Sequence, residues 1–351
     1  MTTPLLKVEN LAKHYPLGTG FLKKDISVVR AVEDVSFTVE AGETLCIVGE
    51  SGCGKSTVAR LLMRLIEPTH GRVLIDGADV ASLNRRALHE SRRRMQMIFQ
   101  DPYSSLNRRL TAGQIVTEPV ENFERLNRQQ REALASDLLQ KVRLAPETKD
   151  RFPSELSGGQ RQRLGIARAL ALKPSIIIAD EALSALDVSV QAQILNLLMD
   201  LQQEMGIAFV FISHDLGVVE HIGHRVAVMY LGRIVELART DTLFAKPIHP
   251  YTEALISAAP VPDPTVARSE LPVEGEVPSP VNPPSGCAFH PRCPLTVERC
   301  RTVVPPLVPS VDGSVVACHV RAPATDAIEQ AIAIAGDQLA PVKESDISIL
   351  R

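Results

Sequence analysis

The chain has 351 residues, of which 45% are hydrophobic and 23% charged, and its formal net charge is −3. This length suits one large domain plus a smaller one, and the near-neutral charge gives no electrostatic argument for binding nucleic acid. No window approaches the roughly 18 consecutive apolar residues of a membrane helix, and the N-terminus lacks the charged-then-apolar pattern of a secretory signal. We therefore expect a cytoplasmic protein, in which six cysteines favour thiols or metal ligands over disulfides.

Short apolar runs alternate with helical patterns along most of the chain. Buried strands are predicted at 44–49, 175–180 and 208–213, from TLCIVG, SIIIAD and AFVFIS. Between the last two, VQAQILNLLMDLQQEMG predicts an amphipathic helix that ends at Gly206. This rhythm predicts an α/β fold with a parallel sheet covered by helices. The stretch from about 101 to 172 is charged and strand-poor, and it predicts a helical subdomain inserted into that core.

The composition changes after residue 255, where prolines begin to recur every few residues. We divide the chain into an α/β domain over 1–255, a proline-rich linker over 256–286, a small cysteine-bearing module over 287–320 and a weakly patterned tail over 321–351.

A phosphate-binding loop is predicted at 49–57, where GESGCGKST fits G-x-x-x-x-G-K-[ST] between a predicted strand and a predicted helix. Glycines allow backbone N–H groups to curl around phosphate oxygens, and the helix N-terminus adds partial positive charge. Lys55 can reach the β- and γ-phosphates of ATP, and the Ser56 hydroxyl can bind Mg²⁺. A glycine-rich turn that binds nothing is the alternative. The predicted loop consists of Gly49, Glu50, Ser51, Gly52, Cys53, Gly54, Lys55, Ser56 and Thr57.

A second glycine-containing loop, LSGGQRQR at 156–163, also leads into a basic helical pattern. Together with GESGCGKST, the pair Asp180-Glu181, SALD at 184–187 and SHD at 213–215, it resembles the ATPase subunits of ABC transporters. The resemblance implies a P-loop NTPase core with a helical subdomain. It also implies that two such subunits stack head to tail, so that the second loop of one caps the ATP held by the other. The residues assigned to this signature loop are Ser157, Gly158, Gly159 and Gln160.

The same resemblance assigns the hydrolytic residues. Asp180 ends an apolar strand, where its carboxylate can hold Mg²⁺ directly or through water. Glu181 is next in line to polarise the attacking water, and His214 is placed to contact the γ-phosphate. We expect Glu181 and His214 to be catalytic.

Three further residues match positions of the family. Gln100, in MIFQDP, matches the glutamine that contacts Mg²⁺ or water and links the core to the helical subdomain. Tyr15, in KHYPL, matches the aromatic residue that stacks on adenine; an exposed tyrosine without a role is the alternative. Asp187 matches the loop that connects the two nucleotide sites across the dimer.

One departure from the family follows the catalytic glutamate. Proline and a small or hydroxylated residue are usual there, whereas this chain has Ala182-Leu183. The loss of a proline removes a fixed φ and loosens the segment, but it deletes no catalytic group. We expect hydrolysis to survive; a subunit that binds ATP without hydrolysing it is the alternative.

Motifs in the C-terminal part of the sequence indicate which branch of the ABC ATPases the chain resembles. HPYTEAL at 249–255, PSPVNPPSGCAFHPRC at 278–293 and VACH at 316–319 resemble the C-terminal extension of oligopeptide and dipeptide permease ATPases, in particular the F-type subunits. The resemblance implies a peripheral protein on the cytoplasmic face of the inner membrane. Its implied partners are two transmembrane permease subunits, a paralogous D-type ATPase and an extracytoplasmic peptide-binding protein. Uptake of glutathione or nickel complexes remains open, as does a soluble ABC ATPase that acts by ATP-dependent dimerisation.

Four cysteines of the extension, Cys287, Cys293, Cys300 and Cys318, have the spacing C-x5-C-x6-C-x17-C. So small a module has little core, and a metal would supply the missing stability. Zinc sites generally use closer cysteine pairs, and the resemblance to peptide permease ATPases implies a [4Fe–4S] cluster. Zinc and free or oxidised thiols are the alternatives.

Overall fold

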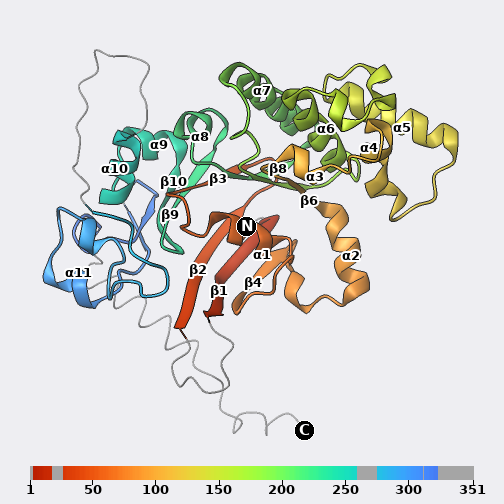
Figure 1. Ribbon diagram of the computed structural model, residues 1–351. Coiled ribbons are helices and arrows are strands. Elements are labelled where there is room, and N and C mark those ends of the chain that lie inside the picture. The colour runs from red at the N-terminus through yellow and green to blue at the C-terminus, as the bar shows by residue number, and fades with distance from the viewer. Residues whose placement is uncertain (1–2, 18–26, 259–274, 311, 323–351) are drawn as a thin grey trace, which may run out of the picture.

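The computed structural model describes residues 3–17, 27–258, 275–310 and 312–322 (Figure 1). Within these residues, one large sheet has the strand order β11-β12-β10-β9-β3-β8-β7-β6. Its parallel part consists of β3 (Thr44–Val48), β6 (Met95–Ile98), β7 (Ile176–Asp180), β8 (Ala208–Ile212) and β9 (Arg225–Tyr230). The three predicted strands are β3, β7 and β8, and all of their residues are buried, as a sheet covered on both faces requires.

Alternate residues of these strands contribute to two separate hydrophobic cores. Ile177 and Phe209 belong to the core shared with the helical subdomain, whereas Ile176 and Val210 belong to the core on the opposite face. The period of two along each strand therefore distributes the apolar side chains between both faces. Figure 1 shows α6 and α7 above the large sheet and a second sheet below it.

This second sheet is antiparallel and was not predicted from the sequence. Its strand order is β2-β1-β4-β5, and the strands are β1 (Leu6–Leu17), β2 (Ser27–Val39), β4 (His70–Ile75) and β5 (Ala78–Asp79). Helix α1 (Lys55–Leu62) lies between it and the large sheet, and Val58 and Leu62 are fully buried there.

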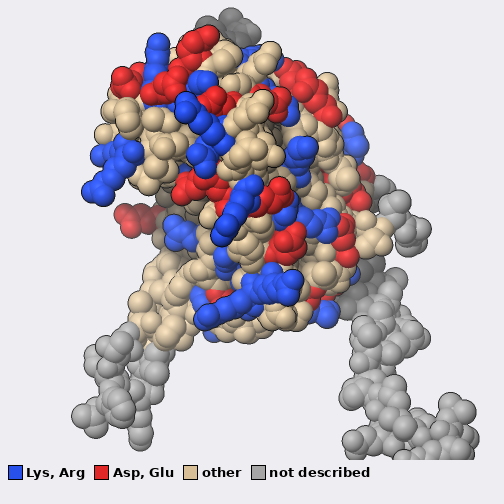
Figure 2. All heavy atoms as spheres, turned by 90° about the vertical axis from the view of Figure 1, so that its right-hand side faces the viewer, with Lys and Arg blue, Asp and Glu red and all other residues tan. Residues whose placement is uncertain are grey.

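The stretch from 101 to 172 contains helices and no strand, and the structure describes all of it. Its helices are α3 (Pro102–Ser105), α4 (Ala112–Glu121), α5 (Arg128–Lys141) and α6 (Gly158–Leu170), with 3-10 turns at Pro146–Asp150 and Pro153–Glu155. Figure 2 faces this side of the molecule, where basic and acidic side chains lie interspersed. This face therefore shows no extended surface of one charge.

The remaining helices of the first 258 residues are α2 (Arg85–Arg94), α7 (Val188–Met205), α8 (Leu216–Ile222), α9 (Thr240–Ala245) and α10 (Pro250–Ser257), with a 3-10 turn at Val80–Ser82. Helix α7 is the predicted amphipathic helix, and it ends at Gly206, whose φ of 67° is the left-handed conformation that glycine adopts without strain. No helix among the described residues is long and apolar enough to cross a membrane.

The C-terminal part continues the large sheet. β10 (Arg233–Arg239) pairs with β9, and β12 (Val315–Val316) pairs with β10. The other elements are a 3-10 turn at His290–Arg292, α11 (Glu298–Thr302) and β11 (Val308–Pro309). Part of the predicted linker, 259–274, and most of the predicted tail, 323–351, lie outside the described residues.

Candidate ATP-binding and hydrolysis site

The predicted phosphate loop connects β3 to α1, and two of its glycines are required by space. Gly49 has a φ of 149° and Gly54 a φ of 107°. A Cβ on Gly49 would overlap the carbonyl oxygen of Met229, and one on Gly54 would overlap that of Ala31. The loop can therefore pass this close to the neighbouring backbone only with glycine at both positions.

Lys55 lies inside this loop and is 5% exposed. Its ammonium group donates hydrogen bonds to the carbonyl oxygens of Gly49 (2.8 Å) and Glu50 (3.0 Å). The positive charge is thus held within the curve of the loop, where it can meet a phosphate. Cys53 is buried, and burial raises the pKa of its thiol, which indicates packing rather than redox chemistry.

Ser56 and Asp180 provide neighbouring oxygen ligands at the end of β7. The Ser56 hydroxyl donates a hydrogen bond of 2.9 Å to Oδ1 of Asp180. Burial raises the pKa of Asp180, because the charged carboxylate loses hydration. A hydroxyl and a partly buried carboxylate at this distance form an oxygen donor set that suits Mg²⁺, whose charge would favour the ionised carboxylate.

Glu181 lies beside Gln100 and His214, at the carboxyl edge of the parallel strands. Nε2 of Gln100 donates to Oε2 of Glu181 at 2.7 Å, and Nδ1 of His214 is 3.8 Å from the same oxygen. The backbone N–H of Glu181 donates to the carbonyl oxygen of Ile212, while its φ of 48° turns the chain sharply after the strand. A cavity of about 50 Å³, lined in part by Glu181, Ser213 and His214, has room for water next to the carboxylate.

At Ala182-Leu183, where the family usually has proline, the segment is held in place by packing and hydrogen bonds. Both side chains are buried, at 3% and 4% exposure. The Ser184 hydroxyl donates to the carbonyl oxygen of Glu181 at 3.0 Å, and Nε2 of Gln191 donates to that of Leu183 at 2.9 Å. These contacts fix the segment after the glutamate, so the expected loosening is offset.

Tyr15 is 36% exposed near the end of β1, and the ammonium group of Lys13 lies 5.1 Å from its ring centroid. Behind it, His14 contacts Glu33 at 2.7 Å, and the ring centroid of His14 is 5.2 Å from that of His70. These three side chains come from β1, β2 and β4, and they brace the strand that carries Tyr15.

The signature loop starts α6 and satisfies its own polar groups. Ser157 accepts a hydrogen bond from the backbone N–H of Gln160, and the Gln160 side chain accepts one from the N–H of Ser157, which is a capping box. Asp187 caps α7 in a similar way. A Cβ on Gly159 would lie 2.7 Å from Cγ1 of Val190, so the two helix starts lie against each other.

Two residues of the C-terminal part, for which the sequence predicted no role, contact the phosphate loop. The Tyr251 hydroxyl accepts a hydrogen bond of 2.9 Å from the N–H of Glu50, and Arg292 binds the Glu50 carboxylate with two N–H groups. The two residues lie in the sequence motifs HPYTEAL and GCAFHPRC. Neither motif indicates a contact with a loop more than 200 residues away.

The four cysteines of the extension are gathered in one region. The N–H of Cys287 donates to the carbonyl oxygen of Cys300 at 2.8 Å, and the other three thiols lie near enough to Cys287 to raise its pKa. Burial raises the pKa of Cys287 to about 11 and also raises that of Cys293. Among the described residues, no three of these sulfur atoms lie within 4.8 Å of one another.

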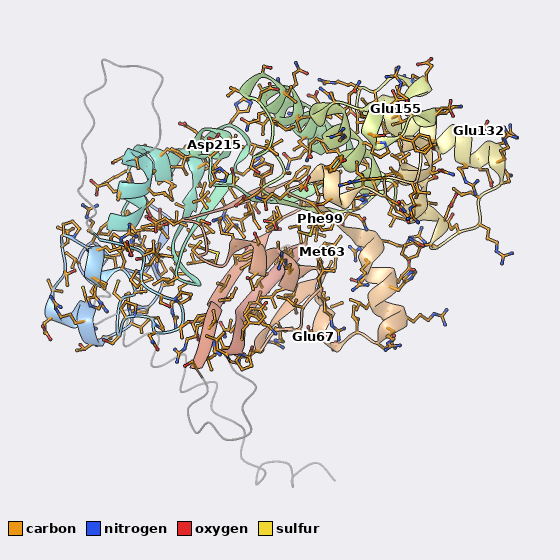
Figure 3. All side chains as sticks on the ribbon, in the orientation of Figure 1. Met63, Glu67, Phe99, Glu132, Glu155 and Asp215 are labelled. Carbon is orange, nitrogen blue, oxygen red and sulfur yellow. The ribbon has the colours of Figure 1, made fainter. Side chains whose placement is uncertain are left out.

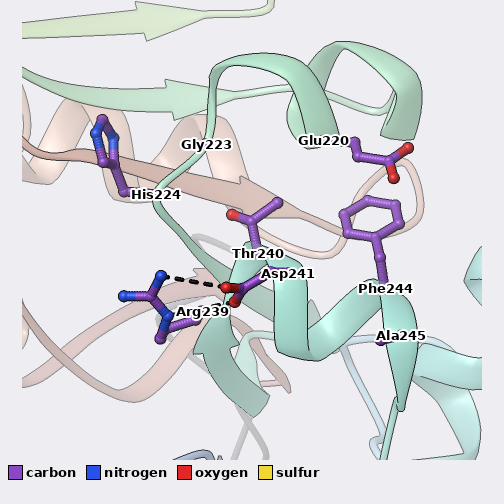
Figure 4. A pocket seen from close by; sticks show the side chains of 8 residues that line it. All are labelled: Glu220, Gly223, His224, Arg239, Thr240, Asp241, Phe244 and Ala245. Carbon is purple, nitrogen blue, oxygen red and sulfur yellow. Dashed lines mark hydrogen bonds and ion pairs between the residues drawn. The ribbon is translucent and has the colours of Figure 1, made fainter.

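A cavity without any of the predicted site residues lies elsewhere, between α8 and α9 (Figure 4). It has a volume of about 620 Å³. Arg239 and Asp241, at its edge, form an ion pair and neutralise each other. We therefore assign the function to the carboxyl edge of the sheet.

The sheet order and the phosphate loop define a P-loop ATPase, and comparisons with known proteins identify the branch. Residues 32–184 match the family model described as "ABC transporter", and residues 235–300 match "Oligopeptide/dipeptide transporter, C-terminal region". The chain belongs to the ABC transporter ATP-binding proteins of the oligopeptide/dipeptide family.

Relatives of similar length support this assignment. The chain is 77% identical over 327 residues to the "Probable peptide ABC transporter ATP-binding protein y4tS" of Sinorhizobium fredii, covering 93% of each chain. It is 46% identical over 318 residues to the "Oligopeptide transport ATP-binding protein AppF" of Bacillus subtilis, covering 90% of this chain and 97% of the relative.

Two solved structures have the same core. The dimeric ATP-binding cassette MJ0796 bound to ADP and Pi is 32% identical, with a TM-score of 0.60, and the match covers 67% of this chain and 98% of that one. The cbiO1 protein of Clostridium perfringens, part of the ABC transporter complex cbiONQ, is 27% identical with a TM-score of 0.60, covering 69% and 91%.

Proposed function

We propose that this chain hydrolyses ATP to power the uptake of dipeptides or oligopeptides through separate membrane permease subunits. The observation that carries the hydrolytic role is the meeting of two pairs at one sheet edge: Ser56 with Asp180, and Gln100 with Glu181. The relatives in Sinorhizobium and Bacillus are named as ATP-binding proteins of peptide and oligopeptide transport.

Each side chain then has a task in hydrolysis. Lys55 exchanges its bonds with loop carbonyls for the β- and γ-phosphates, and Tyr15 stacks on the adenine. Glu181 orients and polarises the attacking water. Gln100 holds the Glu181 carboxylate in place, and His214 contacts the γ-phosphate. Mg²⁺, held by Ser56, Asp180 and Gln100, would neutralise charge that develops on the phosphates.

The signature loop would complete the ATP site of a second ATPase subunit, with Asp187 connecting the two sites. The support is that Ser157 and Gly158 are exposed, while the capping box fixes the start of the helix. The solved relative MJ0796 is described as dimeric. We propose a paralogous D-type subunit as the partner, and a homodimer is the alternative.

A groove beside Gln100 is the surface we propose for a permease subunit. It has a volume of about 420 Å³ and is lined in part by Met63, Phe99, Phe123 and Arg168. Figure 3 labels Met63, which directly follows α1, and Phe99, which directly follows β6. Phe99 is 40% exposed and directly precedes Gln100, so a partner in the groove would act on the Gln100–Glu181 contact.

A permease partner would place the chain at the cytoplasmic face of the inner membrane, and an extracytoplasmic binding protein would supply the peptide. Glutathione and nickel complexes are alternative cargoes. A soluble ATPase is less favoured, because the C-terminal extension matches a transporter family model.

For Cys287, Cys293, Cys300 and Cys318 we propose a structural [4Fe–4S] cluster, with zinc as the alternative. The support is the gathering of four thiols in a small module and the match of part of that module to the C-terminal region of oligopeptide/dipeptide transporters. Such a cluster would cross-link the turn, α11 and the segment after β12. Full-length protein purified without oxygen should contain iron and acid-labile sulfide. One zinc per chain would support the alternative, and the absence of all three would contradict both.

The proposed function is tested by the uptake of labelled dipeptides in cells that produce the wild type, Glu181→Gln or the control Glu204→Gln, which changes an exposed residue of α7. Expression and copurification with membrane subunits are measured in parallel. Glu181→Gln should abolish uptake while complex assembly stays intact. Unchanged uptake in this variant would reject either the hydrolytic role of the site or the peptide cargo, and uptake of glutathione and nickel would be measured next.

A further inference from the structure

Glu50, in the phosphate loop, is held from outside by two C-terminal residues. Arg292 donates from its two terminal nitrogens to the two carboxylate oxygens of Glu50, at 2.9 and 3.1 Å. The Tyr251 hydroxyl accepts the backbone N–H of Glu50 at 2.9 Å. Arg292 is 10% exposed and Glu50 29%, so this two-point ion pair is partly shielded from water.

The position of Arg292 is itself fixed. Its guanidinium carbon lies 5.9 Å from the ring centroids of both Tyr230 and Phe289, in a buried aromatic cluster that also contains Tyr251. The turn that carries it is closed by hydrogen bonds from the N–H of Arg292 to Phe289 and from the N–H of Cys293 to His290. The guanidinium is therefore presented to the phosphate loop by a rigid turn.

Glu50 also participates in the curve of the loop. Its carbonyl oxygen accepts hydrogen bonds from the ammonium group of Lys55 at 3.0 Å and from the N–H of Cys53 at 3.3 Å. A free carboxylate at this position would repel the phosphates of ATP, since like charges at short range raise the free energy. The Arg292 guanidinium neutralises the Glu50 carboxylate, and it also restricts the movement of the phosphate loop at Glu50.

We propose that Arg292 is a positioning residue for ATP binding: by anchoring and neutralising Glu50, it holds the phosphate loop in the shape that accepts a triphosphate. The inference rests on the proposed function, in that it takes the Lys55 loop to be the ATP site. It gives the proline- and cysteine-rich extension a direct effect on the ATPase core.

The test compares the affinity of the full-length chain for ATP in the wild type, Arg292→Gln, Glu50→Gln and the double variant. Arg292→Gln should weaken ATP binding by roughly 5- to 20-fold, in the range of couplings between distinct sites. Adding Glu50→Gln should recover most of this loss, because the unpaired carboxylate is removed. Arg292→Lys should lie between the wild type and Arg292→Gln, since an ammonium group keeps the charge but cannot bind both oxygens in the same way.

Arg301→Gln is the matched control, because Arg301 is in the same module and its side chain forms an exposed ion pair with Glu298. It should bind ATP within about twofold of the wild type, well below the range of site-to-site couplings. Wild-type affinity in folded Arg292→Gln would overturn the inference, and so would an unchanged loss after adding Glu50→Gln. If Arg292→Gln does not fold, the comparison of Arg292→Lys with and without Glu50→Gln decides. A wild-type chain that binds no ATP would instead contradict the proposed function.

Discussion

The phosphate loop and the signature loop look alike in sequence, but the structure supports them in different ways. Both contain glycines and lead into a helix. The phosphate loop is held by distant residues: Asp180, Tyr251 and Arg292 contact Ser56 or Glu50. The signature loop is held by its own capping box, Ser157 with Gln160. The difference indicates that the first loop is assembled by the fold of the whole chain, whereas the second is shaped by its own hydrogen bonds, as its proposed role at a partner's ATP requires.

The largest effect should come from a change at Glu181, the proposed catalytic residue. In Glu181→Gln, ATP hydrolysis should fall by about 10²- to 10⁴-fold, because a neutral amide cannot polarise the attacking water as a carboxylate does. ATP affinity should change little, since Glu181 has no bond to the phosphate loop among the described residues. Steady-state hydrolysis by the assembled complex measures the first quantity, and ATP titration the second. A loss below tenfold would contradict the role of Glu181.

Tyr15, which we propose stacks on the adenine, provides the next test of the ATP site. Tyr15→Ala should weaken ATP binding by roughly 1–3 kcal/mol through the loss of stacking, whereas Tyr15→Phe should bind ATP as the wild type does. Tyr103→Ala is the control, because Tyr103 has a similar exposure (37%) but lies in the helical subdomain. Equal affinity in Tyr15→Ala and Tyr103→Ala would leave Tyr15 as an exposed tyrosine without a role.

A pH prediction follows from the support of Tyr251. Its N–H donates to Nδ1 of His249, and burial lowers the pKa of His249 to about 3 from an ordinary value of 6.5. The unfolded chain therefore binds more protons than the folded chain between these two values, and the folded state loses stability as pH falls below about 6.5. This histidine should remove about 2 kcal/mol of the free energy of unfolding between pH 7.5 and pH 5.

Denaturant unfolding at the two pH values measures this effect. His249→Gln should show a correspondingly smaller loss, and the control His221→Gln, at an exposed position, should behave as the wild type. If the wild type and His249→Gln lose the same free energy on acidification, His249 does not contribute to the pH dependence.

The smallest effect on the isolated chain is expected at the signature loop. Ser157→Ala removes a helix cap and should lower the free energy of unfolding by about 1 kcal/mol. Thr111→Ala, which removes the Thr side chain of the capping box at the start of α4, should cost a similar amount. Only Ser157→Ala should also slow hydrolysis in the assembled pair, while leaving ATP binding by the dilute chain unchanged. Weaker ATP binding by that dilute chain would contradict a role for Ser157 in the partner's site.

Much of the fold was predictable because its signals are local. The buried runs of β3, β7 and β8 and the helix that ends at Gly206 were predicted from hydrophobic pattern and glycine alone. The structure confirms the strands within one residue, and it starts the helix at Val188, two residues before the predicted stretch. The antiparallel sheet was missed. Strand β1 carries three register shifts against β2, and these bulges break the alternation that would have identified both strands.

The sequence by itself determined which residues form the phosphate loop, because its glycines, lysine and serine are adjacent and their spacing is set by the chemistry of phosphate binding. The resemblance to ABC ATPases pointed to Asp180, Glu181 and His214, whose positions at the ends of apolar runs support it, while their roles stay predictions. Only the tertiary structure decided that Tyr251 and Arg292 reach Glu50 across 201 and 242 residues and that β12 extends the large sheet at β10. The physical reason is that such contacts depend on how whole strands and turns pack, and no local pattern encodes which surfaces will meet.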